Sequence, residues 1–83
     1  MRGRRRLPKC GALVSVEWSD ITSTINADLS DAKPVKCTTT GRLVKKTDAF
    51  IVIATSIFEE PGPDISGDFV AIPLGVVGKL TTL

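Results

Sequence analysis

Hydrophobic and polar residues alternate along most of the chain beyond its first ten residues. In the segment LVSVEW, residues 13–18, the apolar residues Val14, Val16 and Trp18 occupy every second position. A period of two places these side chains on one face, as in a half-buried β-strand. We therefore expect the first strand at residues 13–18.

The segment VKCTTTGRLVKK, residues 35–46, carries the clearest alternation and is rich in β-branched residues. It predicts a second strand, with Gly41 at a bend or bulge where the strand turns a corner. One face is predicted to hold Val35, Cys37, Thr39, Gly41 and Leu43. The other face is predicted to hold Lys36, Thr38, Thr40, Arg42 and Lys46.

Residues 49–57, AFIVIATSI, follow a tight turn at 46–49 and are apolar at consecutive positions. This pattern is typical of a strand covered on both faces, either in the centre of a sheet or under a neighbouring subunit. Residues 58–67 are rich in proline, glycine and acids and predict a solvated loop. A strand at 68–72, a break at Pro73 to Gly75 and a last strand at 76–83 complete the pattern.

Residues 19–34 give a mixed signal. Ile21, Ile25 and Leu29 are spaced by four, which fits a helical stripe and an alternating strand equally well. Pro34 prevents a helix from continuing. We expect an irregular connection with a short helix around 27–32.

The C-terminal segments resemble two related groups of small barrels. FVAIPLGVVGKL resembles the place where Src homology 3-like barrels carry Ile-Pro and one turn of 3₁₀-helix before the last strand, since proline fixes φ and lacks a ladder donor. TTTGRLVKKTDAFIVIA resembles the bent strand and following strand of Sm-like proteins. The expected fold is all-β: a small, strongly bent five-stranded antiparallel barrel over residues 11–83, preceded by a flexible basic arm, residues 1–10.

More narrowly, the fragments VEWSD, VKCTTTGRLV, IVIATS and IPLGVVGKL are similar to small phage-encoded proteins of poorly defined function. The similarity covers residues 16–83, and the basic arm has no counterpart in it. The resemblance implies a viral protein that works in the host cytoplasm.

The length of 83 residues allows one domain with a small core, so a homo-oligomer is expected to supply further burial. No apolar run is long enough to cross a membrane, and the N-terminal segment lacks the apolar stretch of a secretion signal. We therefore expect a cytoplasmic protein without a membrane contact.

Charge is distributed unevenly along the chain. The first nine residues hold five of the eleven bases, and the remaining residues hold six bases against nine acids. A terminal block of like charge is often a tail that binds a polyanion, although short basic tails can also have no role. Arginine pairs well with phosphate, so the arm is the strongest functional feature.

A second basic group lies on the strand at 35–46, where Lys36, Arg42 and Lys46 are predicted to share the polar face near Lys45. It either joins the arm in one phosphate-binding patch or marks a charged edge strand that discourages aggregation. The candidate phosphate-binding residues are Arg2, Arg4, Arg5, Arg6, Lys9, Lys36, Thr38, Thr40, Arg42 and Lys46.

The chain has no histidine and no tyrosine, which removes the commonest general base near neutral pH. We expect no enzymatic activity, no cofactor and no metal site, since the acids at 59–68 lack calcium-loop spacing. Cys10 and Cys37 form no C-x-x-C pair, so free thiols are favoured over one disulfide. The scarcity of aromatic residues argues against base recognition by stacking.

Two functions follow from these patterns. The first is an oligomeric binding module for a phosphate-bearing ligand, either nucleic acid bound by the arm or a signalling nucleotide held between subunits near Thr38, Thr40 and Arg42. The alternative is a barrel that binds or inhibits a host protein or belongs to a virion, pairing its exposed strand edges with the partner.

Overall fold

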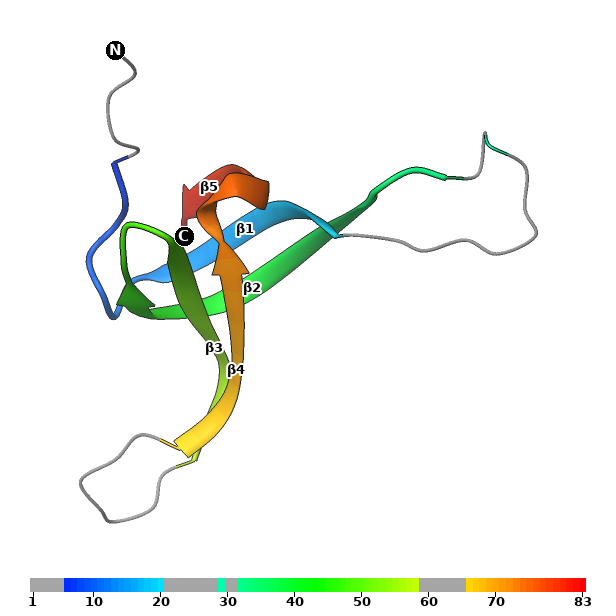
Figure 1. The fold of residues 1–83 in the computed structure, drawn as a ribbon. Coiled ribbons are helices and arrows are strands. Elements are labelled where there is room, and N and C mark those ends of the chain that lie inside the picture. Colours follow the sequence, from blue (N-terminus) through cyan, green and yellow to red (C-terminus); the bar gives the residue numbers. More distant parts are fainter. Residues whose placement is uncertain (1–5, 21–28, 30–31, 59–65) are drawn as a thin grey trace.

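A computed structural model describes residues 6–20, 29, 32–58 and 66–83, and these residues form an antiparallel β-sheet without an α-helix (Figure 1). The elements in chain order are β1 (Leu13–Asp20), β2 (Val35–Lys46), β3 (Phe50–Phe58), β4 (Ser66–Pro73), the 3₁₀ turn η2 (Leu74–Val76) and β5 (Val77–Thr82). The short helix expected around 27–32 lies, apart from Leu29 and Ala32, outside the described residues.

The five strands form one sheet in the order β4-β3-β2-β1-β5. The central strand β2 changes partner along its length: it pairs with β1 from Val35 to Arg42 and with β3 from Arg42 to Lys46. The strands β3 and β4 therefore run across β1, β2 and β5 in Figure 1. The predicted five-stranded antiparallel architecture is confirmed.

The sheet is open, and the prediction of a closed, strongly bent barrel is wrong in this respect. Closure requires the two outermost strands to pair, whereas β4 pairs with β3 and β5 pairs with β1. The chain passes from β4 to β5 through η2, which follows Pro73. The N–H of Leu74 donates to the carbonyl of Ala49 at 2.9 Å and ties this turn to the β2–β3 connection.

One face of the sheet carries the core, in agreement with the alternation in the sequence. Val14 and Val16 of β1 are fully buried, as are Ile51 and Ile53 of β3. The complete cluster consists of Val14, Val16, Leu43, Ile51, Ile53, Ile72 and Val77. Such a small core leaves a limited margin of stability for a chain of this length.

Gly41 lies where β2 passes from one partner strand to the other. A Cβ atom at this position would overlap the carbonyl oxygen of Ala54 and lie 2.8 Å from Cγ2 of Ile53. The expected bend at this glycine is therefore a close approach of two backbones, which only a residue without a side chain permits.

Trp18 packs against the core and places its ring nitrogen toward β2. Its Nε1–H donates to Oγ1 of Thr39 at 2.9 Å.

We expect Thr39→Val to lower the free energy of unfolding by about 1 kcal/mol, because the half-buried indole N–H of Trp18 loses its hydrogen-bond acceptor. Urea unfolding followed by tryptophan fluorescence measures this loss. The control is Thr38→Val on the exposed face, which should change the free energy of unfolding by less than about 0.5 kcal/mol. Equal losses of unfolding free energy in the two variants would contradict a stabilising role of the hydrogen bond from Trp18 to Thr39.

Candidate phosphate-binding surface

The described part of the basic arm lies against the sheet. The N–H of Gly11 donates to the carbonyl of Leu43 at 2.6 Å, and the N–H of Leu43 donates to the carbonyl of Ala12 at 2.9 Å. Leu7 packs against the core cluster. Residues 7–12 therefore lie along β2 on the β1 side of the sheet, whereas the sequence predicted a flexible arm over residues 1–10.

Two cationic side chains of β2 hold the backbone of this segment. Nη1 of Arg42 donates to the carbonyl of Gly11 at 2.8 Å, and Nζ of Lys46 donates to the carbonyl of Pro8 at 2.9 Å. A guanidinium or ammonium group has more N–H donors than one such bond uses, and neither group meets a carboxylate in these bonds. Both side chains are exposed and keep donors for a phosphate.

A bulge changes the faces of the last residues of β2. The register shifts between Leu43 and Lys45, and Lys46 then stands opposite the buried Ile51. Opposed residues share a face, so Lys46 does not share the polar face of Arg42, and this part of the prediction is wrong. Lys45 takes the polar face instead, with its Nζ 5.8 Å from the ring centroid of Phe50.

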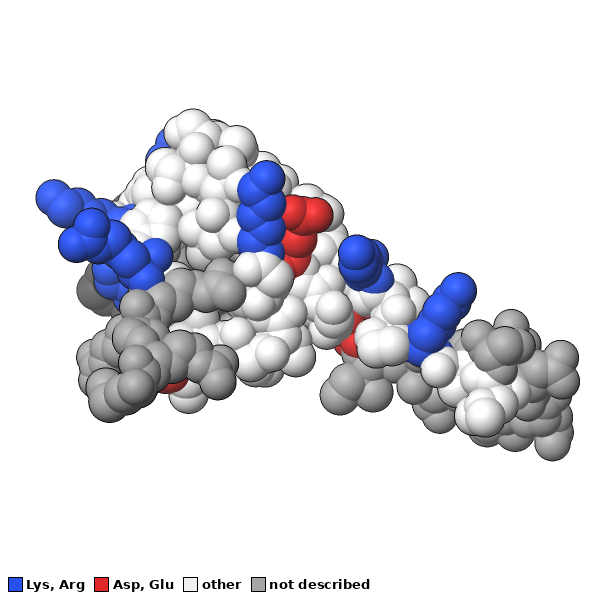
Figure 2. Space-filling view, turned by 90° about the horizontal axis from the view of Figure 1, so that it is seen from above, with Lys and Arg blue, Asp and Glu red and all other residues white. Residues whose placement is uncertain are grey.

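These contacts gather cations at one end of the molecule, which we call the basic end. Its members are Arg6, Lys9, Arg42, Lys45 and Lys46. Figure 2 shows Lys and Arg side chains crowded at the left end of the molecule and more widely spaced elsewhere on that face. Asp48, in the turn after β2, is the acidic residue closest to this end along the chain. The hypothesis that arm and strand form one basic surface is thus consistent with the geometry of the described arm residues.

The remaining candidates lie elsewhere. The hydroxyl of Thr40 donates to Oγ of Ser15 at 3.5 Å. Thr38 is exposed and is paired with Glu17 across the β1–β2 ladder. Lys36 stands ten residues before Lys46, or about 33 Å along an extended strand. One phosphate group cannot contact both ends of β2. Arg2, Arg4 and Arg5 lie outside the described residues.

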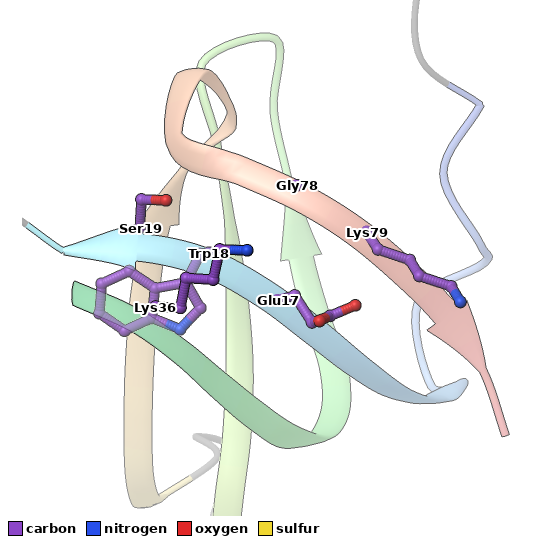
Figure 3. A pocket seen from close by; sticks show the side chains of 6 residues that line it. All are labelled: Glu17, Trp18, Ser19, Lys36, Gly78 and Lys79. Carbon is purple, nitrogen blue, oxygen red and sulfur yellow. The ribbon is translucent and has the colours of Figure 1, made fainter. Parts of the chain in front are cut away.

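Lys36 borders a shallow depression of about 220 Å³ between β1, β2 and β5 (Figure 3). Its other lining residues are Glu17, Trp18, Ser19, Gly78 and Lys79. Lys79 was not among the sequence candidates, because nothing local in the sequence indicates that β5 lies beside β1. The carboxylate of Glu17 lies between the two strands that carry the lysines and opposes the binding of an anion there.

The interpretation of β2 as a charged edge strand is wrong, because β2 is the central strand of the sheet.

The expectation that β3 is a strand covered on both faces is confirmed in part. β3 is an interior strand, with Ile51 and Ile53 buried on one face. Phe50 and Val52 on its other face are half-buried.

The two thiols are free: Cys10 is exposed and Cys37 is half-buried. Of the acids at 59–68 only Asp68 is described, and the described residues contain no group of three or more potential metal-binding side chains. Within the same part of the chain, no helix has the length and apolar character needed to cross a membrane.

The chain matches no protein family, no curated protein and no solved structure.

Proposed function

We propose that this chain is a non-enzymatic binding module that holds the phosphate backbone of a nucleic acid at its basic end. The observation that carries the proposal is the pair of bonds from Arg42 to Gly11 and from Lys46 to Pro8. They fix the backbone that follows the arginines of the arm beside the cations of β2, so that Arg6 and Lys9 lie near charges from a distant part of the sequence. Such a surface attracts a polyanion without reading its sequence.

A nucleic acid suits this arrangement better than a single nucleotide held near Thr38, Thr40 and Arg42. The side chain of Thr40 turns to Ser15 and that of Arg42 turns to Gly11, so these three residues do not converge. The cations instead follow the arm and the end of β2, and spaced charges match a repeating backbone of phosphates. The described surface offers no stacked aromatic platform for bases, which favours phosphate contact.

The proposal extends to the class of fold and the origin of the chain. The single turn of 3₁₀-helix between β4 and β5 stands where the Src homology 3-like resemblance implies one, and it supports assigning the open sheet to that class. The similarity of the sequence to small phage-encoded proteins supports a viral protein in the host cytoplasm. The absence of histidine and tyrosine supports a binding role without catalysis.

A salt series tests the proposed function. The intact chain and a chain lacking residues 1–5 are titrated with duplex DNA of mixed sequence at several salt concentrations. Residues 6–12 are kept, because Leu7 belongs to the packed structure. The deletion removes three arginines, and it should flatten the slope of log K against log salt by about 2.7, since each phosphate contact contributes about 0.9. Equal slopes for the two chains would show that Arg2, Arg4 and Arg5 do not contact the phosphates, and no binding of either chain at low salt would count against a nucleic-acid ligand.

A partner protein is the second candidate, and the apolar side chains exposed on β3 and β4 favour it. In that case the intact chain should retain a host protein from a lysate after nuclease treatment. Retention that disappears with the nuclease would instead point to nucleic acid as the bridge.

A further inference from the structure

A turn at Gly11 directs the first described residues across the end of β2. The N–H of Ala12 donates to the carbonyl of Lys9 at 3.1 Å, and Gly11, the third residue of this turn, has a φ of 98°, as in a type II turn. Gly11 and Ala12 both bond to Leu43, so two residues oppose one, as in a β-bulge. A positive φ favours glycine, and the direction of the segment therefore depends on Gly11. We call residues 6–12 the strap.

The strap is attached to β2 by few contacts. The backbone of Leu43 exchanges two hydrogen bonds with it, and the side chains of Arg42 and Lys46 each donate one to its carbonyls. Leu7 adds a contact with the core. Leu43 is fully buried, and its N–H donates to the carbonyl of Ala12 at 2.9 Å. Exchange of this amide hydrogen with solvent therefore requires the strap to leave β2. A segment with few buried contacts opens more easily than the sheet beneath it unfolds.

Docking of the strap brings like charges together. The strap and residues 42–50 contain five Lys and Arg residues and one acid. The ammonium group of Lys46 bonds to the carbonyl of Pro8, which is the neighbour of Lys9 and is two residues from Arg6. The backbones of these cationic residues thus lie within about 8 Å of Pro8. The Debye length at 0.1 M salt is about 10 Å, so charges this close together repel each other. The cations of β2 hold the strap by hydrogen bonds and repel its charges at the same time.

A polyanion at the basic end counteracts this repulsion. With the strap docked, a phosphate backbone can contact five cations of the basic end, whereas with the strap open it can contact the three on β2. Contacts with phosphates neutralise the charges that repel each other. A ligand that binds one of two states more tightly shifts the equilibrium toward that state. A bound polyanion therefore favours the docked strap.

We propose that the strap opens and closes on β2, and that a nucleic acid bound at the basic end closes it. This inference rests on the proposed function and adds a conformational step to it. Gly11 is a positioning residue in this step, because it sets the direction of the strap. Closure places Leu7 on the core, so the ligand stabilises the small core as well as the strap.

Amide hydrogen exchange of the intact chain, followed by NMR with and without duplex DNA of mixed sequence, tests this inference. Saturating DNA should slow exchange at Leu43 at least about 5-fold, the lower end of usual coupling between two sites. Without DNA, raising sodium chloride from about 0.02 M to about 0.5 M should also slow it, because salt screens the repulsion. The amide of Val16, in the interior of the sheet, should change less in both series.

A substitution at Gly11 tests the coupling without changing any charge. A Cβ at Gly11 meets no atom within 4 Å, so Gly11→Ala strains only the backbone of the docked turn. It should speed exchange at Leu43 in the free chain about 5-fold or more and weaken binding to duplex DNA about 3-fold or more. The matched control is Gly75→Ala, which also meets no atom and has no positive φ, and it should change neither quantity.

The outcomes separate this inference from the proposed function. DNA that binds the intact chain but leaves exchange at Leu43 unchanged, or speeds it, would overturn the inference and leave the proposed function standing. Faster exchange at Leu43 in Gly11→Ala with unchanged DNA affinity would do the same, as would exchange that quickens with salt. No binding of DNA to the intact chain would overturn the proposed function, and this inference with it.

Discussion

Replacing Gly41 by alanine should lower the free energy of unfolding by about 3 kcal/mol or more, because the added methyl group has no room between β2 and β3. The new Cβ would overlap the carbonyl oxygen of Ala54, which is backbone and cannot rotate away. Ala54 is paired with Arg42 on one side and with Phe69 on the other. Moving it would disturb both ladders.

Gly75 provides the matched control for this substitution. A Cβ at Gly75 meets no atom within 4 Å, so Gly75→Ala should change the free energy of unfolding by less than about 0.5 kcal/mol. Urea unfolding of the three proteins gives the comparison. Similar stabilities for Gly41→Ala and Gly75→Ala would refute the close approach of β2 to β3.

Neutralising the basic end should weaken binding to duplex DNA on the order of 100-fold at about 0.1 M salt, since three phosphate contacts and their released counterions are lost. The variant combines Arg6→Gln, Lys9→Gln and Lys45→Gln, which spares the two side chains that hold the arm. The fold should be unaffected, because these side chains are exposed and make no hydrogen bond to the sheet among the interactions described above.

The control for neutralisation removes the same charge elsewhere. Lys33→Gln, Lys36→Gln and Lys79→Gln lie away from the basic end, and this variant should lose less than about 10-fold in affinity, through long-range electrostatics alone. Fluorescence anisotropy with a labelled duplex measures both variants. A control that weakens binding as much as the neutralised basic end would show that only net charge matters.

Local patterns in the sequence predicted the strands well. The segment 35–46 was predicted with the same bounds as β2. Its apolar and polar residues alternate and many are β-branched, which indicates a strand and identifies the face that packs on the core. The end of the strand near Pro73 was likewise predicted from the proline, although β4 includes Pro73, which pairs with Phe50. The 3₁₀ turn after it was expected from the resemblance to Src homology 3-like barrels. The bounds of β2 and the end of β4 depend on neighbouring residues alone.

Features that depend on distant contacts were not predictable in the same way. The bulge after Leu43 moved Lys46 to the opposite face, and no residue in the segment marks it. The docking of residues 7–12 arises from bonds to β2 more than thirty residues away, as from Lys46 to Pro8. The place of Lys79 beside β1 follows from strand order, which alternation does not determine.

If a phosphate backbone binds at the basic end, an amide NMR titration of the intact chain with duplex DNA should show it at the level of single residues. We expect chemical-shift changes concentrated in residues 6–12 and in Arg42 to Lys46, and these changes should become smaller as the salt concentration rises. Shifts concentrated around Trp18, Lys36 and Lys79, or no shifts at low salt, would contradict binding at the basic end.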